Sequence, residues 1–199
     1  MGEKPKELGK GGFGHAGFQR LVGLCPKKLS LVTKYAGRPM NYYASSSRLQ
    51  PEHKLSVMTQ ICKILSTLHQ NGFVHNDIKL QNVCLSLAES GPKVTLIDYG
   101  ITMAIGKYPK LTIQWNDTLP YAPEICSGLT SGVCSEKSDA YSIGQLLHKF
   151  YGSKPIPSLL SSWYEKSQST NPSERRNLAL LEQVLEEQRV LLLKEQKLN

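Results

Sequence analysis

Apolar residues of this chain recur every three or four positions in three segments, which is the spacing of one helix face. The clearest segment is 51–70, where Pro51 stands at the start and Asn71-Gly72 follow the end. These end signals, with the spacing, predict a helix with one buried face. The apolar positions that define this face are Leu55, Met58, Ile61, Ile64, Leu65 and Leu68.

Two further helices are predicted toward the C-terminus. One runs from about Ser138 through Phe150, with apolar residues on one side. The last begins near Asn171-Pro172 or Asn177, and we interpret it as an amphipathic helix packed on its own domain rather than as a partner-binding coil. Its apolar positions are Leu178, Leu181, Val184, Leu185, Leu191 and Leu192.

Short runs of apolar and β-branched residues predict strands elsewhere. The first two are Phe18 to Cys25 and Leu29 to Ala36, separated by the turn-like 25–28, and Gly37-Arg38-Pro39 ends the second. Strands near 83–87 and 94–97 flank a turn at 89–92, so they form a hairpin. Residues 101–121 are polar with few periodic apolar positions.

Composition limits the classes of function. The 199 residues suit one domain or two small lobes, and 40% hydrophobic content supports a sizeable core. Lys and Arg outnumber Asp and Glu by 24 to 16, for a formal charge of +8. The basic residues are scattered along the sequence rather than gathered in one run, which argues against nucleic acid as the partner. A nucleotide ligand needs fewer charges.

The cysteines and the hydropathy pattern favour a reduced cytoplasmic protein that is not bound to a membrane. The five cysteines form no C-x-x-C pair, so neither a disulfide framework nor a zinc site is indicated. The first residues have no apolar signal core, and no run approaches the roughly 18 apolar residues of a membrane span.

Two short motifs contain candidate chemistry. Residues 75–82, His-Asn-Asp-Ile-Lys-Leu-Gln-Asn, place an Asp, a Lys and an Asn in one loop, and Asp98-Tyr99-Gly100 follow the predicted hairpin. Carboxylate and amide oxygens suit Mg²⁺. A glycine-rich turn at residues 9–14 lets backbone amides approach phosphate closely. Its glycines are Gly9, Gly11, Gly12 and Gly14.

These motifs resemble those of the protein kinase family, in the family's order, over nearly all of residues 7–187. The other motifs are a hinge-like stretch at 32–37, Ala-Pro-Glu at 122–124, and 138–144. The resemblance implies an α+β two-lobe fold in a single domain spanning 1–199. An incomplete β lobe and hinge would cover about 7–37, a mainly helical large lobe about 38–187, and a C-terminal helix extension 188–199.

The resemblance also implies roles for single residues. Asp77 would orient the substrate hydroxyl and accept its proton, and Lys79 would neutralise charge on the transferred phosphoryl group. Asn82 and Asp98 would hold Mg²⁺, and the glycine-rich turn would cover the phosphates of ATP. The adenine would lie near Thr33, Lys34, Ala36 and Cys84. Arg175 would pair with Glu124.

The N-terminal part departs from the family pattern. Only residues 15–17 separate Gly14 from Phe18, where the family has a strand with an ATP-binding Lys and a helix with its Glu partner. Three hypotheses follow: a kinase acting on protein hydroxyls, with Ser/Thr slightly favoured over Tyr by Lys79; a pseudokinase acting as a scaffold or binding module; and an inactive fragment. A partner or a dimer would cover the edges of the shortened sheet. The chain between Asp139 and Arg175 is also compressed, which suggests one missing helix.

Overall fold

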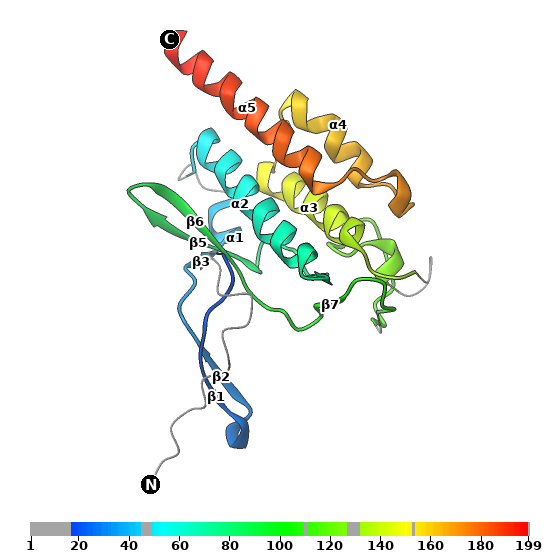
Figure 1. Ribbon diagram of the computed structural model, residues 1–199. Coiled ribbons are helices and arrows are strands. Elements are labelled where there is room, and N and C mark those ends of the chain that lie inside the picture. The colour runs from blue at the N-terminus through cyan, green and yellow to red at the C-terminus, as the bar shows by residue number, and fades with distance from the viewer. Residues whose placement is uncertain (1–16, 45–48, 110, 127–131, 153, 199) are drawn as a thin grey trace.

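The structure is a computed structural model, and it describes residues 17–44, 49–109, 111–126, 132–152 and 154–198. The glycine-rich turn at 9–14 lies outside the described residues. A body of helices carries a short three-stranded sheet on one side, and a separate hairpin projects away from it (Figure 1). No helix in these ranges is both long and apolar enough to cross a membrane.

The projecting hairpin contains the first two strands. β1 (Leu21–Cys25) pairs antiparallel with β2 (Ser30–Thr33), and a 3₁₀ turn, η1 (Pro26–Lys28), connects them. The predicted strand from Phe18 begins only at Leu21, because Phe18 instead forms an isolated parallel bridge to Leu96. The hairpin therefore joins the body at its root.

The second sheet follows the order β3, β5, β6, with β3 (Arg38–Pro39) at its edge. β5 (Val83–Ala88) and β6 (Gly91–Leu96) form the predicted hairpin, although β6 begins three residues earlier and ends one residue earlier than expected. Gly37 has a φ of +101°, and a Cβ built there would lie 2.3 Å from the Leu85 carbonyl oxygen. Glycine is therefore required where the chain turns onto β5.

The helix predicted at 51–70 is confirmed as α2 (Pro51–Gln70), which follows the four-residue α1 (Asn41–Ala44). Pro51 occupies the first turn, where a missing N–H costs nothing. After α2, β4 (Phe73–Val74) pairs with β7 (Met103–Ala104). These two short strands bracket both motifs with candidate chemistry.

The second predicted helix is confirmed as α3 (Glu136–Tyr151). Ser135 and Ser138 form a reciprocal capping box at its start, which satisfies backbone donors that the helix leaves open. A 3₁₀ turn, η2 (Pro123–Ile125), precedes it. The sequence reading did not identify α4 (Ser158–Ser167), which lies in the stretch between Asp139 and Arg175.

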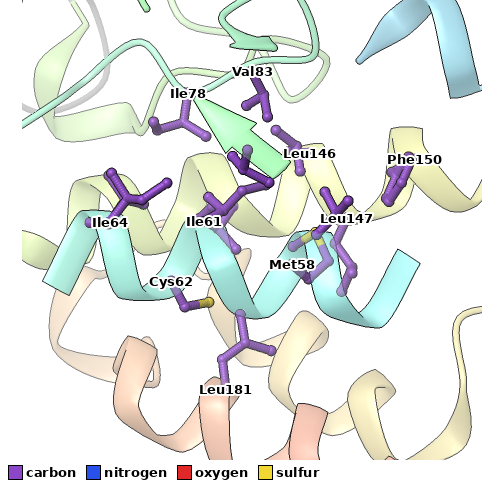
Figure 2. Packing of buried hydrophobic residues seen from close by; sticks show 14 of the residues in the cluster. Met58, Ile61, Cys62, Ile64, Ile78, Val83, Leu146, Leu147, Phe150 and Leu181 are labelled. Atoms are coloured by element: carbon purple, nitrogen blue, oxygen red, sulfur yellow. The ribbon is translucent and has the colours of Figure 1, made fainter. Parts of the chain in front are cut away.

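The last helix, α5 (Leu178–Leu198), begins just after Asn177, and residues 172–174 form a separate 3₁₀ turn, η3 (Pro172–Glu174). Its first half packs on α2 as predicted, with Leu181 pointing toward Cys62 (Figure 2). The prediction was wrong for Leu191, which is exposed, whereas the neighbouring Leu192 is half-buried against the core. The face that contacts the body is thus narrower than the run of apolar residues.

The main core lies between α2, α3, α5 and the three-stranded sheet. Figure 2 shows α2 at the centre of this core. Its Ile61 and Met58 side chains point toward the sheet and α3, whereas Cys62 points toward α5. The core residues include Met58, Ile61, Leu65, Ile78, Val83, Leu85, Ile143, Leu147, Phe150 and Leu181. Since Ile78 and Val83 belong to it, the 75–82 loop is fixed to the core at two points.

Candidate active site

The backbone of the 75–82 loop is held by one buried carboxylate. Asp139, on α3, accepts hydrogen bonds from the backbone N–H of His75 at 2.9 Å and of Asn76 at 2.8 Å. The His69 side chain at the end of α2 lies 2.8 Å from the same carboxylate. Asn76 adopts a φ of +64°, which a non-glycine residue rarely does. Asp139 thus stabilises an unusual turn just before Asp77.

Asp77, Lys79 and Asn82 are brought into direct contact. One carboxylate oxygen of Asp77 accepts a hydrogen bond from Lys79 Nζ at 2.9 Å and another from Asn82 Nδ2 at 2.7 Å. Asn82 Nδ2 also donates to the Asp77 backbone carbonyl at 3.0 Å. The other oxygen, Oδ1, is buried and has no hydrogen-bond partner among the described residues. A buried, unsatisfied acceptor is costly, so this atom is suited to receive a donor from a ligand.

Lys79 remains a cation in this setting. Partial burial acts against its charge, but the hydrogen bond and negative charge of Asp77 outweigh it, and together with Tyr121 they raise the pKa of Lys79. Burial first, and then the nearby Asp77 charge, raise the pKa of Tyr121. The pair therefore presents a fixed positive charge beside a neutral phenol.

Tyr121 is a site residue that the sequence reading did not single out. Tyr121 is the last residue of the polar stretch 101–121, and no motif spacing marks it. In the structure it lines a hollow of about 270 Å³ next to Lys79. The other lining residues come from the 75–82 loop, the 119–120 stretch and α3, and they are Ile78, Leu80, Gln81, Leu119, Pro120, Gln145, Leu146 and Lys149.

Asp98 lies two residues after the end of β6, and the chain before it contacts the 75–82 loop. The Ile97 N–H donates to the Asn82 carbonyl at 3.0 Å, which ties the residue before Asp98 to the loop. Asp98 is exposed with a φ of +63°, and its Oδ1 accepts from the Gly100 N–H at 3.3 Å. The carboxylate is therefore accessible to a cation.

The donor set at Asn82 and Asp98 fits Mg²⁺ in chemistry, because both side chains offer oxygen atoms. The amide nitrogen of Asn82 is occupied by Asp77, which leaves its carbonyl oxygen as the ligating atom. The described residues contain no group of three or more His, Cys, Asp or Glu side chains that could hold a metal. A bound Mg²⁺ would take its remaining ligands from phosphate and water, as this ion commonly does.

Tyr99 packs beneath the motif instead of pointing outward. Its ring lies 4.9 Å from the His75 ring and 6.2 Å from the Phe18 ring, and its hydroxyl donates to the Leu96 carbonyl at 3.0 Å. Burial raises the pKa of this phenol. Tyr therefore fills an apolar position while satisfying its hydroxyl.

The residues expected around an adenine are only partly brought together. Cys84 is buried in β5 and pairs with Pro39, so the hinge-like stretch that contains half-buried Ala36 reaches the strand of Cys84. Burial raises the pKa of the Cys84 thiol, so this side chain is neutral and behaves as a small apolar residue. Thr33 and Lys34 are exposed at the root of the hairpin, where β2 ends. There the Thr33 hydroxyl accepts a hydrogen bond from the Gln19 side chain at 2.9 Å.

The predicted pair of Glu124 and Arg175 is confirmed. Two parallel hydrogen bonds of 2.7 and 2.8 Å join the guanidinium to the carboxylate, and both groups are buried. Ser138 Oγ donates to the same Glu124 at 2.8 Å, and the guanidinium lies 5.1 Å from the centre of the Tyr141 ring. This pair connects the segment that carries Tyr121 to α3 and the stretch before α5.

Comparison with known proteins agrees with this geometry. The family model for the protein kinase domain matches residues 17–191. The match begins after the glycine-rich turn and ends within α5.

Individual relatives are similar at low identity. NUAK family SNF1-like kinase 2 of Rattus norvegicus is 29% identical over 123 residues, covering 61% of this chain and 19% of that protein. Probable serine/threonine-protein kinase fnkE of Dictyostelium discoideum is 30% identical over 124 residues, covering 57% of this chain and 9% of that protein. Serine/threonine-protein kinase PrkC of Bacillus subtilis is 28% identical over 144 residues, covering 68% of this chain and 21% of that protein. The chain thus spans about a fifth or less of the length of these relatives.

Proposed function

Because the chain belongs to the protein kinase family, we propose that its candidate active site transfers the γ-phosphoryl group of ATP to a protein hydroxyl. The observation that carries the proposal is the contact of Asp77 with Lys79 and Asn82, which leaves one buried carboxylate oxygen without a partner among the described residues. Phosphoryl transfer depends mainly on positioning and electrostatics, and this cluster is positioned by the core on both sides.

The chemical step assigns one task to each side chain. Asp77 Oδ1 orients the substrate hydroxyl and takes its proton. The oxygen of that hydroxyl bonds to the γ-phosphorus, and the bond from this phosphorus to the ADP oxygen breaks. Lys79, whose raised pKa keeps it charged, stabilises negative charge on the transferred group. The hollow beside Tyr121 would hold the polypeptide that carries the hydroxyl.

We propose that ATP binds as its Mg²⁺ complex along the edge between the hinge and β5. Asn82 and Asp98 would hold the metal, which neutralises phosphate charge when it is bound. Cys84 and Ala36 would contact the adenine, with Thr33 and Lys34 at the hairpin side. Gly9, Gly11, Gly12 and Gly14, which precede the described residues, would cover the phosphates.

We also propose a division of the domain, a substrate class and a cellular compartment. We divide the single domain into an incomplete small lobe and hinge at about 7–37, a large lobe at about 38–187, and a helix extension at 188–199. The names of the relatives favour Ser/Thr substrates over Tyr. All five cysteines are free thiols, which suits a reducing compartment such as the cytoplasm.

A scaffold or pseudokinase role is the second candidate, and the composition of the hairpin favours it. Residues 17–44 contain no Asp or Glu, so none of their lysines can pair with a carboxylate of its own segment. Lys27, Lys28 and Lys34 are all exposed. The site therefore has no described counterpart of the family's Lys-Glu pair, and loss of one preorganised donor costs roughly 10²–10³ in rate.

The test is phosphoryl transfer from radiolabelled ATP to a generic protein substrate. We expect very slow turnover that falls to background in Asp77→Asn, because the amide cannot accept the hydroxyl proton. Asp117→Asn is the matched control, since Asp117 is exposed on the neighbouring segment. Equal background for the parent and Asp77→Asn would contradict transfer and support the scaffold role.

A further inference from the structure

The β1–β2 hairpin presents an apolar stripe to solvent on one face. Leu24 lies directly opposite Leu31 across the two strands, and Leu21 lies opposite Thr33, two residues along β2 from Leu31. Leu31 and Thr33 are two apart on β2 and share a face, and a register irregularity between Leu21 and Gly23 offsets the odd spacing of Leu21 and Leu24 on β1. Leu21, Leu24 and Leu31 therefore form one stripe. All three are exposed, by 40%, 46% and 66%. This set of three leucines is called the leucine stripe below.

Large apolar side chains are also exposed at the tip of the hairpin and on its other face. Leu29, next to the turn, is 94% exposed and has a φ of +47°, which is unfavourable for a bulky side chain. Val22, Val32 and Tyr35 are exposed as well. Soluble domains rarely leave so many large apolar residues exposed together, so the hairpin has the properties of an interaction surface.

The backbone edges of the hairpin are also available. Within the part of the chain that the structure describes, β1 and β2 pair only with each other. A two-stranded hairpin is marginal alone, and open edges present N–H and C=O groups that another strand can pair with. An added strand would bring both main-chain hydrogen bonds and side chains to the leucine stripe.

The positive charge of the hairpin region indicates which kind of partner would bind this surface. Residues 17–44 carry five basic side chains and no acidic one. The basic residues are Arg20, Lys27, Lys28, Lys34 and Arg38. A second copy of the hairpin would bring two sets of positive charges together, which disfavours self-pairing. An acidic partner is complementary.

The open edges distinguish a protein partner from a lipid surface. Unpaired backbone groups are several kcal/mol unfavourable in hydrocarbon, and open sheet edges do not occur there. The leucine stripe also runs along the strands, from Leu21 opposite Thr33 to Leu24 opposite Leu31, rather than lying only at the tip. Both features favour an extended polypeptide.

We propose that the β1–β2 hairpin binds an extended protein segment of alternating apolar and acidic residues, which adds to it as a strand. The apolar side chains of the segment would cover the leucine stripe, and its carboxylates would approach the basic residues of the hairpin. This interaction does not involve Asp77, Lys79, Asn82 or Asp98, and it requires neither nucleotide nor phosphoryl transfer.

The first test uses a fluorescent peptide of alternating Val and Glu, about six residues long as strands usually are. Its binding to the full chain is measured by fluorescence anisotropy. We expect binding that weakens as salt is raised, because the charges are exposed. A peptide with Lys in place of Glu should not bind, and one with a central Pro should bind roughly tenfold more weakly, since Pro removes a ladder hydrogen bond.

The second test compares two substitutions of similarly exposed leucines. Leu24→Asp on the stripe should weaken binding roughly tenfold or more, whereas Leu191→Asp on α5 should leave it unchanged; Leu24 is 46% exposed and Leu191 is 44% exposed. Thermal unfolding of each variant checks that the body remains folded. Binding of the full chain to phosphatidylserine vesicles is measured in parallel. The proposal is overturned if the Glu and Lys peptides bind equally, if both variants bind like the parent, or if the chain binds the vesicles but neither peptide.

Discussion

At the scale of the residue, the pair of Glu124 and Arg175 has the largest expected energetic consequence. Both groups are buried and joined by two hydrogen bonds. Arg175→Ala leaves the Glu124 carboxylate buried without its counter-charge, which should lower the free energy of unfolding by about 3–5 kcal/mol. Urea denaturation followed by circular dichroism measures this change.

A surface pair provides the matched control for that prediction. Arg189 and Glu186 form an ion pair on α5 with both side chains exposed. Arg189→Ala should leave the urea midpoint almost unchanged, because solvent screens exposed charges. The role assigned to the buried pair would be wrong if Arg175→Ala unfolded at the same urea concentration as the parent.

His75 should make stability depend on pH. Burial is the largest effect on this imidazole and lowers its pKa below 6.5, although Asp139 and other carboxylates act in the opposite direction. The unfolded chain therefore binds a proton at a higher pH than the folded chain, so the free energy of unfolding falls as pH drops below about 6.5. A single such group contributes up to about 1.4 kcal/mol per pH unit.

The measurement is urea denaturation at several pH values between 7 and about 5, the range in which histidine titrates. His75→Phe keeps an aromatic ring against Tyr99 and should flatten the pH dependence. His148→Phe is the control, since His148 is exposed on α3. A parent whose stability stays constant over this range would contradict the prediction.

The sequence predicted the contacts of some single residues better than others. The grouping of Asp77 with Lys79 and Asn82 follows from their closeness in one loop, and the structure shows them in contact. Asp139 and Tyr121 lie far from that loop in sequence, so their positions depend on the packing of α3 and of the 119–122 segment. Local spacing contains no information about such packing.

At the scale of the element, α5 is held to the body by a few leucines of its first half. Leu181 is fully buried and points toward Cys62 of α2. Leu181→Ala should leave a cavity and lower the free energy of unfolding by about 2–5 kcal/mol. Leu191→Ala should have little effect, because Leu191 is exposed on the same helix. Urea denaturation of both variants measures the difference. Equal urea midpoints for Leu181→Ala and Leu191→Ala would contradict this packing.

The helices were predictable because α2 and α3 show both periodicity and end signals. α5 shows where periodicity fails, since residues 190–193 are all apolar and only Leu192 among them is half-buried. α4 (Ser158–Ser167) has Leu159, Leu160, Trp163 and Tyr164 at helical spacing, but it is only ten residues long and no side-chain cap marks its start. Its burial of Trp163 against the core comes from tertiary contacts.

At the scale of the whole molecule, the helical body is fixed by many more internal contacts than the projecting hairpin. The 75–82 loop is fixed by the main core and by Asp139, whereas the hairpin joins the body mainly through residues 17–19 and the hinge. The side of the site that binds the transferred group is therefore well ordered by contacts. The side that would enclose the nucleotide has few described contacts.

This asymmetry leads to the prediction that the chain binds ATP weakly and only with Mg²⁺. Asn82 and Asp98 supply metal ligands, but no described lysine is paired so as to clamp the phosphates, and a ligand raises stability according to its affinity. Thermal unfolding at millimolar ATP should show a small upward shift with Mg²⁺ and a smaller one without it. Asp98→Asn should abolish the metal-dependent part, whereas Asp117→Asn, a change of an exposed carboxylate elsewhere, should preserve it. No shift in the parent, or an equal shift in Asp98→Asn, would show that these residues do not form the nucleotide site.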